Sequence, residues 1–312
     1  MLIDQREVLK VLRCPKTGGE LQQNNGHLVA ARDQENVIYE IVKDYPVLID
    51  FEKSVLKQED ATSLSSVIDR NNYSGILGQV KRLLSPLKST TIENVQELLN
   101  LILTEQDSVT VLIIGGGTVG NGMNVFYNDP RIKLISFDIY ASPSVQFLAD
   151  AHNIPLLDNT FDLVIVQAVL EHVLEPHKVV SEINRVLKIG GFVYAETPFL
   201  QHVHEGAYDF TRFTDSGHRY LFREFELIKS GVISGAGTQL MWSLEYFFSG
   251  LFRSRKVGKL IKFLFFWLQY CDDIVPDSYN IDSASGVFFL GKKIDSAINL
   301  NDIITYYKGA QN

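Results

Sequence analysis

The sequence predicts a doubly wound α/β fold from three observations. Short apolar runs, each typical of a buried parallel strand, recur at 110–114, 134–139, 163–167 and 192–197. Helical patterns separate these runs, most clearly over 176–187. A glycine-rich turn follows the first run directly. Strands that alternate with helices in this way form a sheet covered on both faces, with its ligands beyond the carboxyl ends of the strands.

The composition is that of a folded protein with one large core and a smaller unit. The chain has 312 residues, of which 46% are hydrophobic and 21% are charged. Its net charge of -8 argues against general nucleic-acid binding, which needs a basic face. The start is charged, and the longest apolar stretch, 260–270, is shorter than the roughly 20 residues of a spanning helix. We therefore expect a cytoplasmic protein, and its two cysteines fit a reducing compartment.

The first 56 residues predict a small β-rich domain. A short helix over 5–12 leads to a turn-rich knuckle at Cys14, and strand-like pieces follow at 37–41 and 45–49. This segment resembles the zinc-ribbon-like domain that accompanies many methyltransferases. Only Cys14 matches the four cysteines of that family, and Thr17 stands where the second would be. Zinc needs four good ligands, so we expect a degenerate domain without metal.

Residues 57–106 predict a linker and a helical segment. The chain is polar over 59–66, and one helix is expected over 77–87. A second should begin near Thr90, because Thr90 and Glu93 have the spacing of a capping box. Its buried face would carry four apolar side chains at helical spacing: Ile92, Val95, Leu99 and Ile102.

The glycine-rich turn contains G-x-G-x-x-G at Gly115, Gly117 and Gly120, between a predicted strand and a predicted helix. Glycines allow a sharp turn and let a ligand approach the backbone. The alternative is a close-packed turn that binds nothing. Asp138 follows 18 residues after Gly120, at a strand end where a carboxylate can bind ribose hydroxyls. A turn or helix-capping aspartate is the alternative there.

A longer pattern separates the possible nucleotide cofactors. Residues 148–176 read L-A-D-A-H-N-I-P-L-L-D-N-T-F-D-L-V-I-V-Q-A-V-L-E-H-V-L-E-P, and E-I-N-R-V-L-K-I-G-G follows at 182–191. This block resembles the class I S-adenosylmethionine-dependent methyltransferases of the small-molecule type 11 group. NAD-dependent dehydrogenases do not carry it. The resemblance implies a Rossmann-like seven-stranded sheet over 107–312, with the last strand antiparallel, and S-adenosyl-L-methionine as cofactor.

The same resemblance assigns cofactor contacts within the block. Asp150 would accept a hydrogen bond from the adenine amino group, the backbone of Ala151 would meet the ring, and Gln167 would lie near the sulfonium. One position departs from the family, because Ile113 stands where an acidic residue often holds the methionine ammonium group. Another group, such as a backbone carbonyl near Gly115, would then bind the ammonium.

The loop after the fifth strand, 197–214, should cover the acceptor. It is similar to a loop in methyltransferases often associated with bacterial surface polysaccharides. His204, Tyr208, Asp209 and Arg212 are the substrate-side candidates, although Asp209 and Arg212 could instead form an ion pair that holds the loop. His172 is the best placed base, with a purely structural histidine as the alternative. His202 and His204 alternate and could bind a metal, but the sequence fixes no third ligand, so none is expected.

The last third predicts strands over 225–231 and 286–293, with a helical insert at about 236–280 that is aromatic and locally basic. We expect this insert to cover the sheet or to form a homodimer surface. A peripheral contact with the inner membrane face, where a lipid-linked substrate could lie, is the alternative.

These features predict methyl transfer, with O-methylation of a small-molecule or glycan-type acceptor, as in surface polysaccharides, as the main hypothesis. Methylation of tRNA or of a translation factor is a second hypothesis, because the N-terminal segment resembles partners of such enzymes. A non-catalytic module that binds the cofactor within a glycan-assembly complex is a third.

Overall fold

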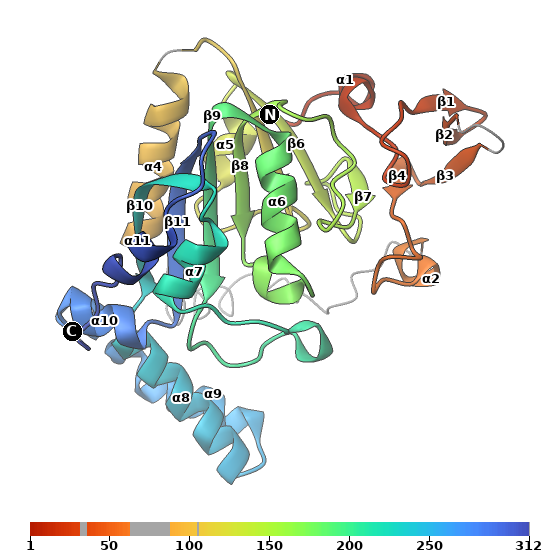
Figure 1. Cartoon of the computed structure of the whole chain (residues 1–312). Helices are drawn as coiled ribbons and strands as arrows, with labels where there is room; N and C mark the ends of the chain where they lie inside the picture. The colour runs from red at the N-terminus through yellow and green to blue at the C-terminus, as the bar shows by residue number, and fades with distance from the viewer. Residues whose placement is uncertain (32–35, 63–87, 105, 312) are drawn as a thin grey trace.

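The computed structural model describes residues 1–31, 36–62, 88–104 and 106–311. The helix expected over 77–87 and the second half of the linker expected at 59–66 lie outside these residues, and the first half, 59–62, is helical. The described strands form one continuous sheet of eleven in the order β1-β2-β3-β4-β7-β6-β5-β8-β9-β11-β10 (Figure 1). The seven strands from β7 to β10 correspond to the predicted Rossmann-like sheet, so the fold class is confirmed.

The strands of this part begin and end close to where the sequence predicts them. Five are mutually parallel: β5 (Val109–Ile114), β6 (Ile132–Asp138), β7 (Phe147–Ala149), β8 (Phe161–Gln167) and β9 (Leu187–Pro198). β11 (Gly286–Lys293) lies antiparallel between β9 and β10 (Phe225–Ser234). The antiparallel last strand is therefore confirmed. The short strand β7 was not predicted, because its three residues carry too little pattern.

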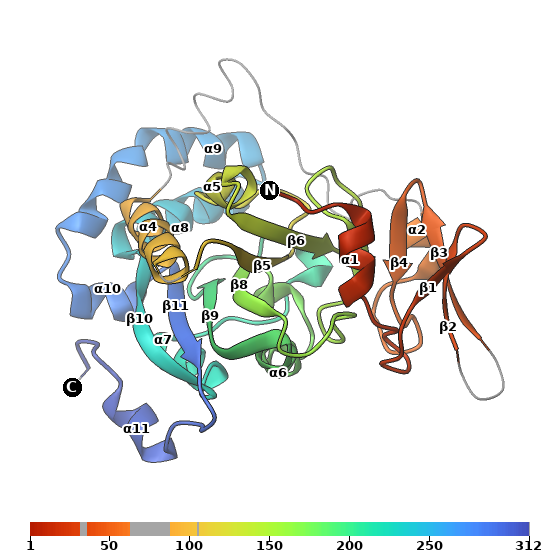
Figure 2. The same ribbon diagram turned by 90° about the horizontal axis from the view of Figure 1, so that it is seen from above.

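Helices cover both faces of the sheet (Figure 2). One face packs against α6 (Pro176–Val186) and α7 (Asp215–Leu221), and the other against α4 (Ser89–Leu103) and α5 (Asn124–Asn128). The runs of apolar residues in β5 and β8 follow from this double cover, since their side chains are buried on both faces.

The predicted capping box of α4 is wrong. The helix begins at Ser89 with Lys88 as its N-cap, and no side chain there caps the backbone. Thr90 is therefore inside the first turn. The buried face is also rotated from the predicted one, because it includes the polar side chain of Asn94, while Ile92 is 41% exposed. Asn94 is buried because its amide donates to the Tyr194 hydroxyl at 3.2 Å.

The N-terminal unit consists of α1 (Gln5–Val11), β1 (Gln22–Asn24), β2 (His27–Ala30), β3 (Val37–Val42) and β4 (Tyr45–Leu48), followed by α2 (Gln58–Thr62). Its strand β4 pairs with β7 in parallel, with Val47 opposite Leu148. The unit thus extends the large sheet, which its sequence does not predict. Within it, the Cys14 thiol is buried 3.2 Å from the Tyr39 hydroxyl.

The insert forms α8 (Ala236–Leu251), α9 (Arg255–Leu264), the 3-10 helix η3 (Phe266–Asp273) and α10 (Asp277–Ser283). Helices α8 and α9 pack against each other and project beyond the sheet (Figure 1). The chain ends with α11 (Leu300–Thr305). Among the described residues, no helix combines the length and the apolar character needed to cross a membrane.

Candidate functional site

A cavity of about 630 Å³ lies at the carboxyl ends of β5, β6 and β8. This is the edge where ligands bind in open α/β sheets. Most of the predicted cofactor residues line it, namely Gly115, Gly120, Asp138, Asp150, Ala151 and Gln167. Gly117 does not line the cavity, but its backbone N–H donates a hydrogen bond to Asp138, which does.

The three glycines of the G-x-G-x-x-G motif have no room for a side chain. A Cβ on Gly117 would lie 2.7 Å from Asp138 Oδ2 and 2.3 Å from the Tyr140 ring, and one on Gly120 would lie 1.9 Å from Gln167 Oε1. Gly115 has a φ of 75°, which favours glycine. The turn therefore brings backbone to the cavity wall, as the motif predicts.

The two predicted carboxylates have different partners. Asp138 accepts a hydrogen bond from Gly117 N at 2.7 Å and lies at the end of β6. Asp150 accepts from His152 Nδ1 at 2.5 Å and from the Ser54 hydroxyl. Burial acts to raise the pKa of Asp150, but the hydrogen bonds from His152 and Ser54 outweigh it and lower that pKa. Both side chains line one cavity, and their contacts with ribose and adenine stay a prediction.

The N-terminal unit closes one side of this cavity. Val55 and Leu56 belong to its wall, and Ser54 binds Asp150. These residues lie almost 100 positions before Asp150 in the chain. No motif marks them, so sequence analysis missed their contribution.

Glu196 is a further cavity residue that sequence analysis missed. It lies near the end of β9, and its Oε2 accepts a hydrogen bond from Gln167 Nε2 at 2.8 Å. Burial raises the pKa of its carboxyl, although hydrogen bonds from Tyr194 and Gln167 oppose this. Ile113 is buried in the core, so β5 offers no carboxylate to the cavity, whereas Glu196 on β9 places a carboxyl in its wall. The available signal was an acidic residue in an otherwise apolar strand.

A second cavity of about 260 Å³ adjoins the first, and the two share Asn121, Ala168, Glu196 and His204. Its wall is assembled from the end of β9, the following loop, β10, β11, α4, α8 and η3. Three buried polar atoms in this wall have no hydrogen-bond partner among the described residues: Glu171 Oε2, Thr197 Oγ1 and Trp242 Nε1. Such atoms are costly unless a ligand or water satisfies them.

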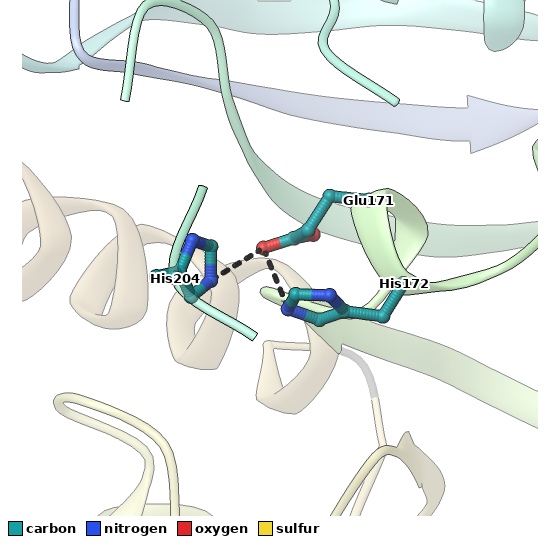
Figure 3. Close-up of side chains that lie close together, drawn as sticks. All are labelled: Glu171, His172 and His204. Atoms are coloured by element: carbon teal, nitrogen blue, oxygen red, sulfur yellow. Dashed lines mark ion pairs between the residues drawn. The ribbon is translucent and has the colours of Figure 1, made fainter. Parts of the chain in front are cut away.

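Glu171, His172 and His204 meet where the two cavities join (Figure 3). Glu171 Oε1 lies 3.6 Å from His172 Nε2 and 3.9 Å from His204 Nε2. Burial raises the pKa of Glu171 to about 8, and burial together with the neighbouring His172 lowers the pKa of His204. The structure thus brings the predicted His172 and His204 together with a carboxyl that sequence analysis did not single out.

Asp209 and Arg212 lie behind this cluster and line neither cavity. They form an ion pair, and Arg212 also donates to the carbonyl of Gln201 at 2.9 Å. Burial acts to raise the pKa of Asp209, but the hydrogen bonds from Arg212 and from His204 N lower it to about 2. This is the loop-holding arrangement that the sequence left as an alternative to substrate contact.

The other loop candidates also differ in position. Tyr208 lines the cofactor cavity, and its carbonyl binds His172 Nδ1 at 2.8 Å. The His202 ring is separate from the cluster and stacks on Tyr246 with 4.3 Å between centroids. His202 and His204 therefore do not converge on one point.

Comparison with known proteins places this site in a family. Residues 120–195 match the family model described as a methyltransferase domain. The chain contains a class I methyltransferase domain. The match covers the end of the glycine-rich turn, the strand ends that carry Asp138 and Asp150, and β8. It does not extend to the N-terminal unit, whose zinc-ribbon-like character remains a prediction.

Relatives of the methyltransferase domain are distant. A demethylmenaquinone methyltransferase of Paenarthrobacter aurescens (strain TC1) is 35% identical over 71 residues, which is 22% of this chain and 28% of that protein. A Haemonchus contortus phosphoethanolamine N-methyltransferase 2 with S-adenosyl-L-methionine has a TM-score of 0.43 at 16% identity, over 64% of this chain and 52% of that one. A coclaurine N-methyltransferase has a TM-score of 0.40 at 14% identity, over 78% and 81% of the two chains.

Proposed function

We propose that the protein transfers a methyl group from S-adenosyl-L-methionine to a hydroxyl of a small polar acceptor. The single observation that carries this proposal is the pair of joined cavities with the Glu171, His172 and His204 side chains at their junction. The first cavity has the glycine turn, Asp138 and Asp150 that suit an adenosyl group. The second, smaller cavity receives the acceptor.

The bound cofactor supplies an electrophilic methyl group on a sulfonium, and transfer needs the acceptor oxygen in line with it. Positioning two reactants in adjoining cavities can provide much of the acceleration. The Glu196 carboxyl, which lines both cavities, is a suitable partner for the ammonium group of the cofactor. His172 and His204 present Nε2 at the junction, where an imidazole can accept the proton of a hydroxyl.

The wall of the second cavity supports a compact hydroxylated acceptor, such as a single sugar residue of a glycan. Trp242 offers a flat apolar surface and one N–H donor, while Thr197 can donate or accept. At about 260 Å³ the cavity is smaller than a typical drug-sized site. An extended acceptor would therefore enter with one unit only.

Calorimetry with S-adenosylhomocysteine tests the cofactor assignment. Wild type should bind, and Asp138→Ala should abolish measurable binding, because the carboxylate that meets the ribose is lost. Asp158→Ala is the control, since this aspartate is 64% exposed beyond the amino end of β8. Equal affinity for all three proteins would contradict the assignment.

Transfer of a labelled methyl group then separates enzyme from binding module. The substrates are a panel of sugars and glycans, with bulk tRNA and protein as competing acceptors. We expect label in the sugar fraction. Label only in tRNA or protein would overturn the small-acceptor proposal, and cofactor binding with no transfer to any of these acceptors would favour a non-catalytic module.

We also propose that the α8–α9 hairpin contacts an anionic membrane surface. The hairpin and the start of η3 expose seven large apolar side chains: Phe247, Leu251, Phe252, Leu260, Phe263, Leu264 and Trp267. Basic side chains accompany them, with Arg253, Arg255, Lys256 and Lys259 all exposed. Apolar and cationic groups together suit the boundary of an anionic bilayer better than a second copy of the hairpin, which would repeat the same charges.

Flotation with vesicles of phosphatidylglycerol and phosphatidylcholine tests the hairpin. Wild type should float, and the double variant Leu251→Ser/Phe252→Ser should not. Tyr279→Ser is the control, because Tyr279 is 61% exposed on α10, which is not part of the hairpin. Failure of the wild type to float, together with a dimer that the double variant breaks, would replace the membrane with a homodimer interface.

A further inference from the structure

We propose that Glu171, His172 and His204 form a binding site for a divalent transition-metal ion, Zn²⁺ by preference, with an open coordination position toward the acceptor cavity. The site deepens the proposed function. With the ion bound, Nε2 of His172 and of His204 hold the metal and no longer accept the proton, and only the role of the ion in orienting the acceptor rests on that function. Sequence analysis expected no metal, because the alternating His202 and His204 gave two candidate ligands and the pattern indicated no third. Folding replaces one of them, His202, with Glu171 and His172.

The distances suit one small ion. The three ligand atoms, Glu171 Oε1, His172 Nε2 and His204 Nε2, all lie within 4.8 Å of one another. Tetrahedral ligands about 2.1 Å from zinc are separated by roughly 3.4 Å. The pairs at 3.6 and 3.9 Å therefore need only small side-chain movements to close on an ion.

Both imidazoles are held in the orientation that a metal ligand requires. The Tyr208 carbonyl can only accept, so His172 Nδ1 at 2.8 Å carries the hydrogen and leaves the Nε2 lone pair facing Glu171. His204 Nδ1 lies 3.3 Å from Asp209 Oδ2, a carboxylate that Arg212 holds in place. A carbonyl or carboxylate behind each histidine is the usual outer support of a metal site.

The charges at the site also favour a cation. The Glu171 side chain is 1% exposed, and its Oε2 has no hydrogen-bond partner among the described residues. The charge of Arg212 in the 197–214 loop acts on Glu171, but its side chain is paired with Asp209. Ionising a buried carboxyl is costly, and a divalent ion would compensate the charge. Glu205 Oε2, 3.5 Å from His172 Nε2, adds negative charge at the rim.

The ligand set and its position indicate both the metal and its use. Two imidazoles and one carboxylate with a free fourth position form the pattern of catalytic zinc. The free position faces the junction of the two cavities, since His204 lines both. An ion there would orient an acceptor oxygen next to the cofactor. Asp209 and Arg212 then act as positioning residues, through His204.

Titration calorimetry of the full-length chain, stripped with EDTA, tests the site with Zn²⁺ alone. Wild type should bind one ion, and Glu171→Gln and His204→Ala should each weaken binding by about 100-fold or more. His202→Ala is the matched control and should leave the affinity unchanged. Absorption of Co²⁺ bound to wild type gives a second readout that needs no variant, and should show tetrahedral coordination.

Two results would overturn the site: no binding of Zn²⁺ by wild type, or equal binding by wild type and Glu171→Gln. Titration of the same samples with S-adenosylhomocysteine keeps this test separate from the proposed function. Cofactor binding without ion binding leaves the imidazoles as proton acceptors. Ion binding without cofactor binding overturns the methyltransferase proposal and keeps the metal site.

Discussion

The two adjoining cavities were built in different ways. Most of the cofactor cavity comes from one stretch of chain between Ile114 and Val173, where consecutive strands end at the same edge. The acceptor cavity collects side chains from α4 to β11, which are separated by up to 200 residues. The first has a local sequence signature for that reason, and the second has none. We therefore expect substitutions around the cofactor cavity to change cofactor affinity. Substitutions on the acceptor side should change stability and leave that affinity unchanged.

The largest expected effect is on the glycine-rich turn. Gly117→Ala would place a methyl group 2.7 Å from Asp138 Oδ2 and against the Tyr140 ring, so both cavity residues must move. We expect affinity for S-adenosylhomocysteine to fall about 100-fold, corresponding to the loss of one or two charge-assisted hydrogen bonds. Calorimetry measures this, with Gly250→Ala as the control. An unchanged affinity would show that Asp138 does not hold the ligand.

The second prediction concerns the pH dependence of stability, which should come from a histidine that lines neither cavity. His218 lies on α7, which follows the acceptor loop, and it packs against Phe222 and Phe289 beside Arg219. Burial lowers its pKa from 6.5 to about 3. The unfolded chain therefore binds this proton more readily, and stability present above pH 6.5 is lost as the pH falls toward 3.

The expected loss is about 1.4 kcal/mol per pH unit, or roughly 2 kcal/mol between pH 6.5 and 5. Urea denaturation across this range measures it. His218→Leu should show a flatter dependence than wild type, whereas the exposed His177→Leu should match wild type. A slope that His218→Leu leaves unchanged would mean that another group causes the acid sensitivity.

The third prediction compares two glycines of the α8–α9 hairpin, which forms part of the acceptor side. A Cβ on Gly258 would lie 1.8 Å from Ser249 Oγ and 2.6 Å from the Glu245 carbonyl oxygen, whereas one on Gly250 meets nothing within 4 Å. Gly258→Ala should destabilise by about 1–3 kcal/mol, because the helices must separate. Gly250→Ala should stabilise by about 0.5–1 kcal/mol.

Thermal and urea unfolding measure both changes, and cofactor affinity should remain that of wild type. A loss of affinity in Gly258→Ala would show that the hairpin and the cofactor cavity are coupled, which would remove the proposed separation between the two regions.

The smallest expected effect concerns the N-terminal wall. Ser54→Ala removes the hydroxyl that donates to Asp150. We expect about fivefold weaker binding of S-adenosylhomocysteine, since one hydrogen bond contributes about 1 kcal/mol. Ser144→Ala is the control, because Ser144 donates through its backbone N–H to Ser142 Oγ and the substitution keeps that N–H. Equal binding by Ser54→Ala and wild type would mean that this unit only extends the sheet.

The cofactor side could be predicted because its determinants are local. Gly115 follows β5 and Asp138 ends β6, two strands that the sequence predicts, and parallel strands bring their carboxyl ends together. Asp150 follows the short β7, which no pattern predicts, and its assignment came from the family resemblance. The capping box of α4 was wrong because local spacing does not include packing. The spacing indicated Thr90 as the cap, but the buried contact between Asn94 and Tyr194 sets how the helix packs.

The sequence by itself determined where most strands of the large sheet lie and which residues stand near their ends, because periodicity and glycine placement act over a few positions. Only the tertiary structure decided that Ser54 meets Asp150, that Glu196 lines both cavities, and that Glu171 joins His172 and His204. These contacts link segments far apart in the chain. Their partners are chosen by how helices and strands pack, which no local pattern records.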